Sequence, residues 1–308
     1  MKTIIKKKRH HYIPRFYLDG FVDPGNEPYI WVYEKGKPNI IKATAENVAV
    51  RKHYYSFIRA PGDENSFEDI FAKIESEVAP IFKKIINHEK LKNEERSSFA
   101  YFLALIMMRV PKYRENIERV TGEIIKSISM LKASDIEGFK SMIKKFEKDK
   151  GSRIGVPTEE LQEFILSGEF DIVVNPQFSL GMLGLAKHFA PIFHAMNWAF
   201  LEASDYKFVT SDNPLFYYDP TYYPTSVHGV GLLSKNIEVT FPISKDLMLF
   251  ASWNRPEGYE KLNNKMVKDS NCRTIISALR FVFAPLNSKD LNRTVQKYKN
   301  SSPIIKMV

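Results

Sequence analysis

The chain has 308 residues, of which 44% are hydrophobic and 13% aromatic, and its formal net charge is +9. This apolar content is sufficient for a packed core, which excludes a chain that is disordered throughout. The single cysteine, Cys272, excludes an internal disulfide and a cysteine-based zinc site, and it fits a reducing, cytoplasmic location. No apolar run approaches the ~18 residues of a membrane span, so we expect neither a membrane segment nor an export signal.

Three segments carry most of the positive charge, at residues 1–10, 140–153 and 289–308. The first of them has five cations and no acidic residue. Segregated cations favour an anionic partner, such as nucleic acid or another phosphate-bearing ligand. Three solvated surfaces would give the same pattern, so the charge alone does not decide between these interpretations.

Residues 1–60 have the pattern of β structure. Residues 29–33 are aromatic and β-branched, and a Gly-Lys-Pro-Asn turn separates them from Ile40 and Ile41, which predicts a hairpin. The segment 53–58 predicts a third extended piece.

Residues 66–203 predict a helical part. Ser66 and Asp69 form a capping box before a run with helical spacing, in which Pro80 should introduce a kink. Asn93 can cap the next helix, whose apolar residues 99–108 occupy every side and indicate a buried position. Further helices are expected from about 111 to 131, near 135–148 and 159–167, and over 177–202.

Residues 205–308 return to short strands. The N-terminal strands are too few to form a stable sheet alone, so we expect them to pair with the C-terminal strands. The prediction is one α+β domain over 1–308, with N- and C-terminal strands combined in a mixed sheet and a large helical middle section. The C-terminal elements expected are strands at 206–210, 215–218, 237–241, 247–251 and 280–284, and helices near 259–277 and 287–299.

The strongest candidate for a site is the run His10-His11-Tyr12-Ile13-Pro14-Arg15, which follows four adjacent cations. Histidine acts as a general base near neutral pH or as a metal ligand, and an arginine binds phosphate or carboxylate through its planar guanidinium. In an extended segment, only one of His10 and His11 would face a given pocket. The alternative is a strand whose histidines and tyrosines hydrogen-bond to the backbone.

A second candidate is the run Thr210-Ser211-Asp212-Asn213-Pro214 after a predicted strand. Its polar side chains can form a site or simply shape a tight turn. If the chain ends meet, Asp212 is the expected partner of the histidines. At the helix junction Arg109-Val110-Pro111, the arginine can bind an anion or cap the preceding helix.

These motifs resemble, in order along most of the chain, the signatures of the bacterial domain of unknown function 4238 family. The resemblance implies a cytoplasmic bacterial protein but no particular activity. It also implies one site formed from His10, His11, Arg15, Arg109, Asp212 and Asn213. The matching segments are 10–18, 29–33, 53–55, 109–111, 211–214 and 241–244, with Asn271 and Ala278 in the last helix.

Three functions are compatible with the sequence. The favoured one is a nuclease-like enzyme that cleaves phosphodiesters, with a divalent metal as a candidate cofactor. The alternatives are a non-catalytic module that binds nucleic acid or a nucleotide, and an interaction protein with no active site. In the first, the catalytic residues are His10, His11 and Asp212, and the substrate-binding residues are Arg15, Tyr17, Arg109, Ser211 and Asn213. The sequence leaves substrate, metal and oligomeric state open.

Overall fold

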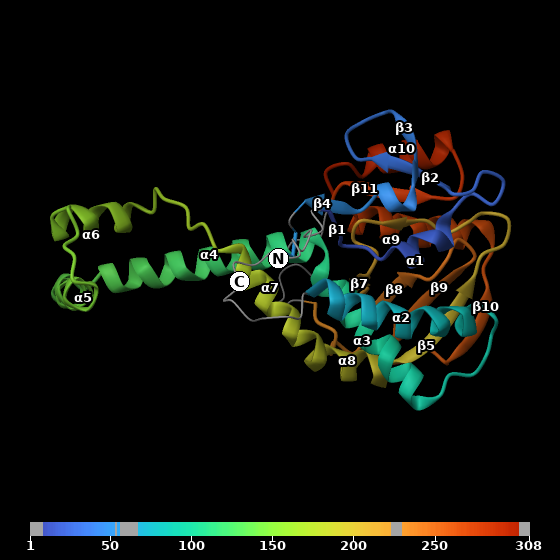
Figure 1. Ribbon diagram of the computed structural model, residues 1–308, viewed down its shortest axis with the longest axis horizontal. Helices are drawn as coiled ribbons and strands as arrows, with labels where there is room; N and C mark the ends of the chain where they lie inside the picture. The colour runs from blue at the N-terminus through green and yellow to red at the C-terminus, as the bar shows by residue number, and fades with distance from the viewer. Residues whose placement is uncertain (1–8, 53, 56–66, 223–229, 302–308) are drawn as a thin grey trace, which may run out of the picture. The chain divides into compact units, whose positions relative to one another are not determined.

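The computed structural model describes residues 9–52, 54–55, 67–222 and 230–301 (Figure 1). Two compact units are distinguished within the chain, and the second consists, among the described residues, of 115–179. The first unit contains the described strands together with helices from both ends of the chain, which confirms the predicted α+β class. The single domain over 1–308 stays a prediction.

Strands from the two chain ends share one antiparallel sheet. Strand β2 pairs with β3 as the predicted hairpin and, on its other side, with β11, so that Tyr33 lies opposite Val282. Strand β11 then pairs with β6. The predicted pairing of N- and C-terminal strands is therefore confirmed. The strands are β2 (Tyr29–Glu34), β3 (Ile40–Thr44), β6 (Thr210–Ser211) and β11 (Phe281–Ala284).

A second, mixed sheet has the order β10-β5-β9-β8-β7, and its only parallel pair is β10 with β5. The strand β5 corrects the helix expected over 177–202. Trp198 and Phe200 face the main core, whereas Ala199 and Leu201 face a second apolar cluster. A strand buried on both faces is a continuous apolar run, which periodicity cannot distinguish from a buried helix. The strands are β5 (Asn197–Glu202), β7 (Phe216–Tyr218), β8 (Glu238–Pro242), β9 (Leu247–Ser252) and β10 (Gly258–Lys261).

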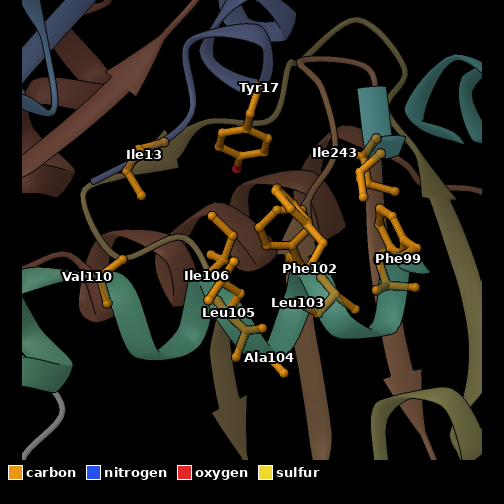
Figure 2. Packing of buried hydrophobic residues seen from close by; sticks show 14 of the residues in the cluster. Ile13, Tyr17, Phe99, Phe102, Leu103, Ala104, Leu105, Ile106, Val110 and Ile243 are labelled. Atoms are coloured by element: carbon orange, nitrogen blue, oxygen red, sulfur yellow. The ribbon is translucent and has the colours of Figure 1, made fainter. Parts of the chain in front are cut away.

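The main core forms where α2, α3 and α8 pack with the opening segment and the mixed sheet. The helix α3 is buried around most of its circumference, as its apolar sequence predicted. Figure 2 shows Ile13 and Tyr17 of the opening segment facing the apolar side chains of α3. These elements are α1 (Arg15–Leu18), η1 (Asp19–Phe21), α2 (Phe67–Ile86), α3 (Asn93–Arg109), η3 (Met182–Leu185) and α8 (Ala186–Ala195).

Helix α10 (Lys289–Lys297) lies close to its predicted position, whereas α9 (Asn264–Ser277) begins five residues later than predicted, because residues 259–261 belong to the strand β10. A short strand, β4 (Val50–Lys52), follows η2 (Ala45–Asn47) and ends before the segment 53–58 that was predicted as the third extended piece. Of that segment only Tyr54 and Tyr55 are described, and they lie in a turn and not in a strand, which corrects the prediction at these two residues. The proposed Ser66 cap lies outside the described residues.

The second unit consists largely of helices. Its elements are the part of α4 (Pro111–Ala133) from residue 115 onward, α5 (Ile136–Lys150), α6 (Thr158–Ser167) and most of α7 (Pro176–Gly181). The starts and ends of α5 and α6 differ from the predicted ones by at most two residues. In the parts of the chain that the structure describes, no helix combines the length and the apolar character needed to cross a bilayer.

Asp212 follows β6 and ties the end of α9 to the start of β11. Its Oδ1 accepts the backbone N–H of Leu279 at 2.8 Å, and its Oδ2 accepts those of Arg280 and Phe281 at 2.8 and 2.9 Å. The side chain is buried, and desolvation raises the pKa of Asp212 to about 6. The three N–H groups and the charge of Lys35 act in the opposite direction and limit this rise in pKa. The carboxyl group therefore has a clear structural role.

This raised pKa predicts a specific pH dependence of stability. A folded-state pKa above the unfolded value means that the group stabilises the fold when protonated and that this contribution is lost as pH rises through about 6. The stability advantage of the wild type over Asp212→Asn should therefore fall by about 2 kcal/mol between about pH 4.5 and about pH 7.5. Urea denaturation measures it, with the exposed Asp290→Asn as control. An advantage that grows with pH would contradict the raised pKa.

Candidate functional site

The two histidines lie on β1 (Arg9–His11), which pairs with β4 and not with a C-terminal strand. His10 lies opposite Arg51, and His11 lies opposite Val50. The alternation of a strand sends the two side chains to different environments. His10 is buried, whereas His11 is half-buried and lines a pocket.

The pocket has a volume of about 540 Å³ and lies within the first unit. It brings together three of the predicted site residues, namely His11, Arg15 and Arg109. Its lining also contains carboxylates and aromatic rings, so the wall has both charge signs. The other lining residues are Arg9, Glu46, Tyr55, Glu68, Phe71, Ala72 and Glu75.

Arg109, the last residue of α3, organises the pocket wall. Its Nη1 donates to Glu75 at 2.8 Å, its Nη2 to the carbonyl oxygen of His11 at 2.7 Å, and its Nε to the hydroxyl of Tyr55 at 3.2 Å. The guanidinium also lies 4.4 Å from the ring of Phe71. Because it is buried and its charge is paired, Arg109 holds the backbone of β1 in place and does not act as a free cation.

The buried His10 supports the pocket wall by binding the backbone of Tyr55, which lines the pocket. Its Nδ1 accepts the backbone N–H of Tyr55 at 3.1 Å, and the two rings are 5.7 Å apart. A ring nitrogen that accepts this bond carries no proton, so the 3.8 Å approach of Glu68 to the same atom is a contact and not an ion pair. This is the backbone-bonding role that the sequence left open for one histidine of the pair.

His11 differs from His10 in being available for chemistry. Its Nδ1 is buried and has no hydrogen-bond partner among the residues that the structure describes, and the residue lines the pocket. Burial, followed by the positive charges of Arg109 and Arg9, lowers the pKa of His11 below its ordinary value. The imidazole is therefore neutral at pH 7 and can accept a proton.

Arg9 and Arg15 are the exposed cations of the pocket. Arg9 donates to the side chain of Asn47 at 3.2 Å, and Arg15 begins α1. Both residues line the pocket together with His11, and the positive charge of each helps to lower the pKa of His11.

The remaining predicted residues do not line this pocket. Tyr17 is fully buried, and its hydroxyl lies 2.6 Å from that of Thr210. The side chain of Asn213 donates to the backbone and side chain of Ser277, and Ser211 accepts the backbone N–H of Asn213. These bonds close the turn after β6.

Asp212 lies toward the buried side of the opening segment. Its charge helps to raise the pKa of Tyr12, the residue after His11, and Tyr12 points into the core. The Asp212 carboxylate is bonded to the backbone of residues 279–281 and does not line the pocket that His11 lines. The chain ends do meet, through Tyr17 and Thr210, but the expected His–Asp pair is not formed in the pocket.

The pocket carboxylates Glu68 and Glu75 were not predicted. They are seven residues apart on α2, with Phe71 and Ala72 between them, so all four share one face. That spacing was visible in the sequence, but charged residues at helical spacing usually indicate a solvated face. Across the described residues, no group of three or more His, Cys, Asp and Glu side chains is arranged to hold a metal ion.

Comparison with known proteins confirms the family resemblance found in the sequence. A family model described as "Protein of unknown function (DUF4238)" matches residues 9–288, which include β1, the pocket residues and the turn at Asp212. No curated protein and no solved structure matches the chain. Because the match extends over most of the 308 residues, the chain belongs to the DUF4238 family.

Proposed function

We propose that the pocket beside β1 binds a phosphate-bearing ligand and cleaves a phosphodiester bond in it, with His11 as the proton-transfer group. The observation that carries the proposal is a pocket-lining imidazole, whose pKa is lowered by burial and by nearby arginines, beside two exposed arginines. A base that is neutral at pH 7 is suited to general base catalysis, and arginines bind phosphate oxygens through paired N–H groups.

In the proposed reaction, Nε2 of His11 accepts a proton from the attacking hydroxyl or water. The P–O bond to this nucleophile forms as the bond to the leaving oxygen breaks, and the leaving oxygen takes a proton from solvent. Arg9 and Arg15 would stabilise the negative charge on the phosphoryl oxygens. Arg109 acts indirectly, because it fixes the backbone of His11.

The size and charge of the pocket limit the ligand class. A volume of about 540 Å³ holds a nucleotide-sized group and not a duplex. Three glutamates offset the three arginines of the lining, so the pocket is not part of a long basic groove. We therefore favour a nucleotide or the end of a single strand as the ligand.

One observation favours the second candidate, a module that binds a nucleotide without cleaving it. No described carboxylate hydrogen-bonds to the side chain of His11, and Asp212 is occupied elsewhere. An imidazole without an orienting partner is a weaker catalyst. Binding and cleavage must therefore be measured on the same variants.

Substitution of His11 separates the two candidates. His11→Ala should reduce cleavage of a single-stranded oligonucleotide or of bis(p-nitrophenyl) phosphate on the order of 100-fold, because a general base contributes about that much. Binding of the oligonucleotide should persist. The assay is run with and without Mg²⁺ or Mn²⁺, and the surface variant His188→Ala is the control. Binding without turnover in the wild type would support the module, and neither binding nor turnover would contradict both.

Arg15 provides a test of ligand binding. Loss of its exposed guanidinium in Arg15→Ala should weaken oligonucleotide binding on the order of 10-fold, because charge-assisted hydrogen bonds to phosphate are lost. The salt dependence of binding should become shallower, which a titration at several ionic strengths would show. Arg153→Ala, an exposed arginine of the second unit, is the matched control. Equal effects of the two variants would argue against the pocket as the binding site.

The lowered pKa of His11 predicts the pH profile. The reaction requires the neutral imidazole, so the acidic limb of kcat/KM should lie below pH 6.5, the ordinary value for histidine. Arg9→Gln removes one of the charges that lower this pKa and should move the limb upward. A limb that stays in place in Arg9→Gln, or lies above the ordinary value in the wild type, would exclude His11 as the base.

A further inference from the structure

The ribbon formed by β1 and β4 places two exposed cations directly opposite each other. Arg9 of β1 is the register partner of Lys52 of β4, and both side chains are exposed. Opposite residues of antiparallel strands point to the same side of a sheet, as do residues two apart on one strand. Lys52 therefore shares the side of the ribbon on which Arg9 and His11 line the pocket, although it lies outside the lining itself.

This arrangement of Arg9 and Lys52 is unfavourable for the ribbon alone. Like charges directly opposite each other destabilise a pair of strands, and a two-stranded sheet is only marginally stable. Arg9 donates to the neutral side chain of Asn47 at 3.2 Å, and neither cation forms an ion pair with a carboxylate of the described residues. An anion bound between the two side chains would remove their repulsion.

The charges that line the pocket are separated by structural element. The exposed cations Arg9 and Arg15 belong to the opening segment, whereas Glu68 and Glu75 belong to α2, and Glu46 belongs to η2. A ligand with its phosphates along the ribbon would turn its other groups toward α2. Carboxylates on that wall accept hydrogen bonds from hydroxyl or amino groups, which the sugars and bases of a nucleotide chain carry.

The spacing along β1 fits two successive phosphates of one nucleic-acid strand. Arg9 and His11 are two residues apart in an extended strand, so their Cα atoms are separated by about 7 Å. Successive phosphates of an extended single strand have a similar separation, because a sugar lies between them. The phosphates of a nucleoside diphosphate share one bridging oxygen and are much closer together.

We propose that Lys52 binds a second phosphate of the ligand, with Arg9 between this phosphate and the one that is cleaved beside His11. The ligand is then the end of a single strand that carries at least two phosphates. This inference rests on the proposed function, since it uses the same pocket. It adds the class of substrate and a binding residue outside the pocket lining.

The test compares the binding of three forms of thymidylyl-thymidine, with no terminal phosphate, a 5′ phosphate or a 3′ phosphate. The full chain should bind one of the two phosphorylated forms on the order of 10-fold more tightly than the form without a terminal phosphate, because a charge-assisted contact is added. Lys52→Gln should abolish this preference and leave the affinity for the form without a terminal phosphate unchanged. Calorimetric titrations repeated in a His11→Ala background avoid turnover of the ligand.

Three controls separate the charge of Lys52 from its effect on folding. Lys52→Arg should retain the preference, because the positive charge is kept. Lys265→Gln, which removes an exposed lysine of α9, should also retain it. The melting temperature of Lys52→Gln should not fall below that of the wild type, because the substitution removes a repulsion between opposite residues.

The possible results distinguish this inference from the proposed function. Equal binding of the three dinucleotides by the wild type would overturn the second phosphate site and leave the proposed function standing. A preference that persists in Lys52→Gln would overturn the role of Lys52. Thymidine diphosphate that binds as tightly as the preferred dinucleotide, with the same dependence on Lys52, would overturn the single-strand end as the ligand. If no dinucleotide binds, the proposed function fails and the inference fails with it.

Discussion

The buried guanidinium of Arg109 is the interaction on which the candidate site depends. It joins the end of α3 to Glu75 of α2, to the backbone of β1 at His11 and to Tyr55. A buried charge is tolerated only when it is paired and hydrogen-bonded, since an uncompensated one costs several kcal/mol. The position of His11 is therefore coupled to the packing of two helices, and the pocket is preorganised by the same contact that stabilises the fold.

The alternation of the opening segment then assigns each side chain its environment. His10 points to the backbone of Tyr55, His11 to the pocket and Tyr12 to the core. One residue of register would exchange these environments and bury the pocket-facing imidazole. The pairing of β1 with β4 is thus a functional constraint in the proposed site, although among the described residues it consists of three residue pairs.

The sequence predicted the parts of the fold that follow from local pattern. The hairpin of β2 and β3, the buried α3 and the pairing of N-terminal with C-terminal strands, although not which strands pair, follow from alternation, apolar periodicity and the need of short strands for partners. The strand at 197–202 could not be predicted, because residues buried on both faces have no period.

The role of Asp212 could not be predicted either, for a different reason. A polar turn after a strand has the same residue types whether it serves a ligand or its own backbone. The deciding fact is that the N–H groups of residues 279–281 converge on the carboxylate, and these come from a segment almost seventy residues later. Glu75 is the opposite case, because its sequence pattern indicated a solvated helix face but the residue lines the pocket. Its partner Arg109 is distant in sequence, so the pairing could not be predicted.

The positions and partners of the cations in the structure change how the net positive charge of the chain is interpreted. The lysines of 140–153 belong to an acidic unit, and in the C-terminal segment Arg293 pairs with Asp290 while Lys297 lies over the ring of Tyr298. In the described part of the opening segment, exposed arginines line the same pocket as an imidazole whose pKa is lowered. The phosphate proposal thus depends on Arg9, Arg15 and His11, and a net charge of +9 by itself would support it no better than a solvated surface.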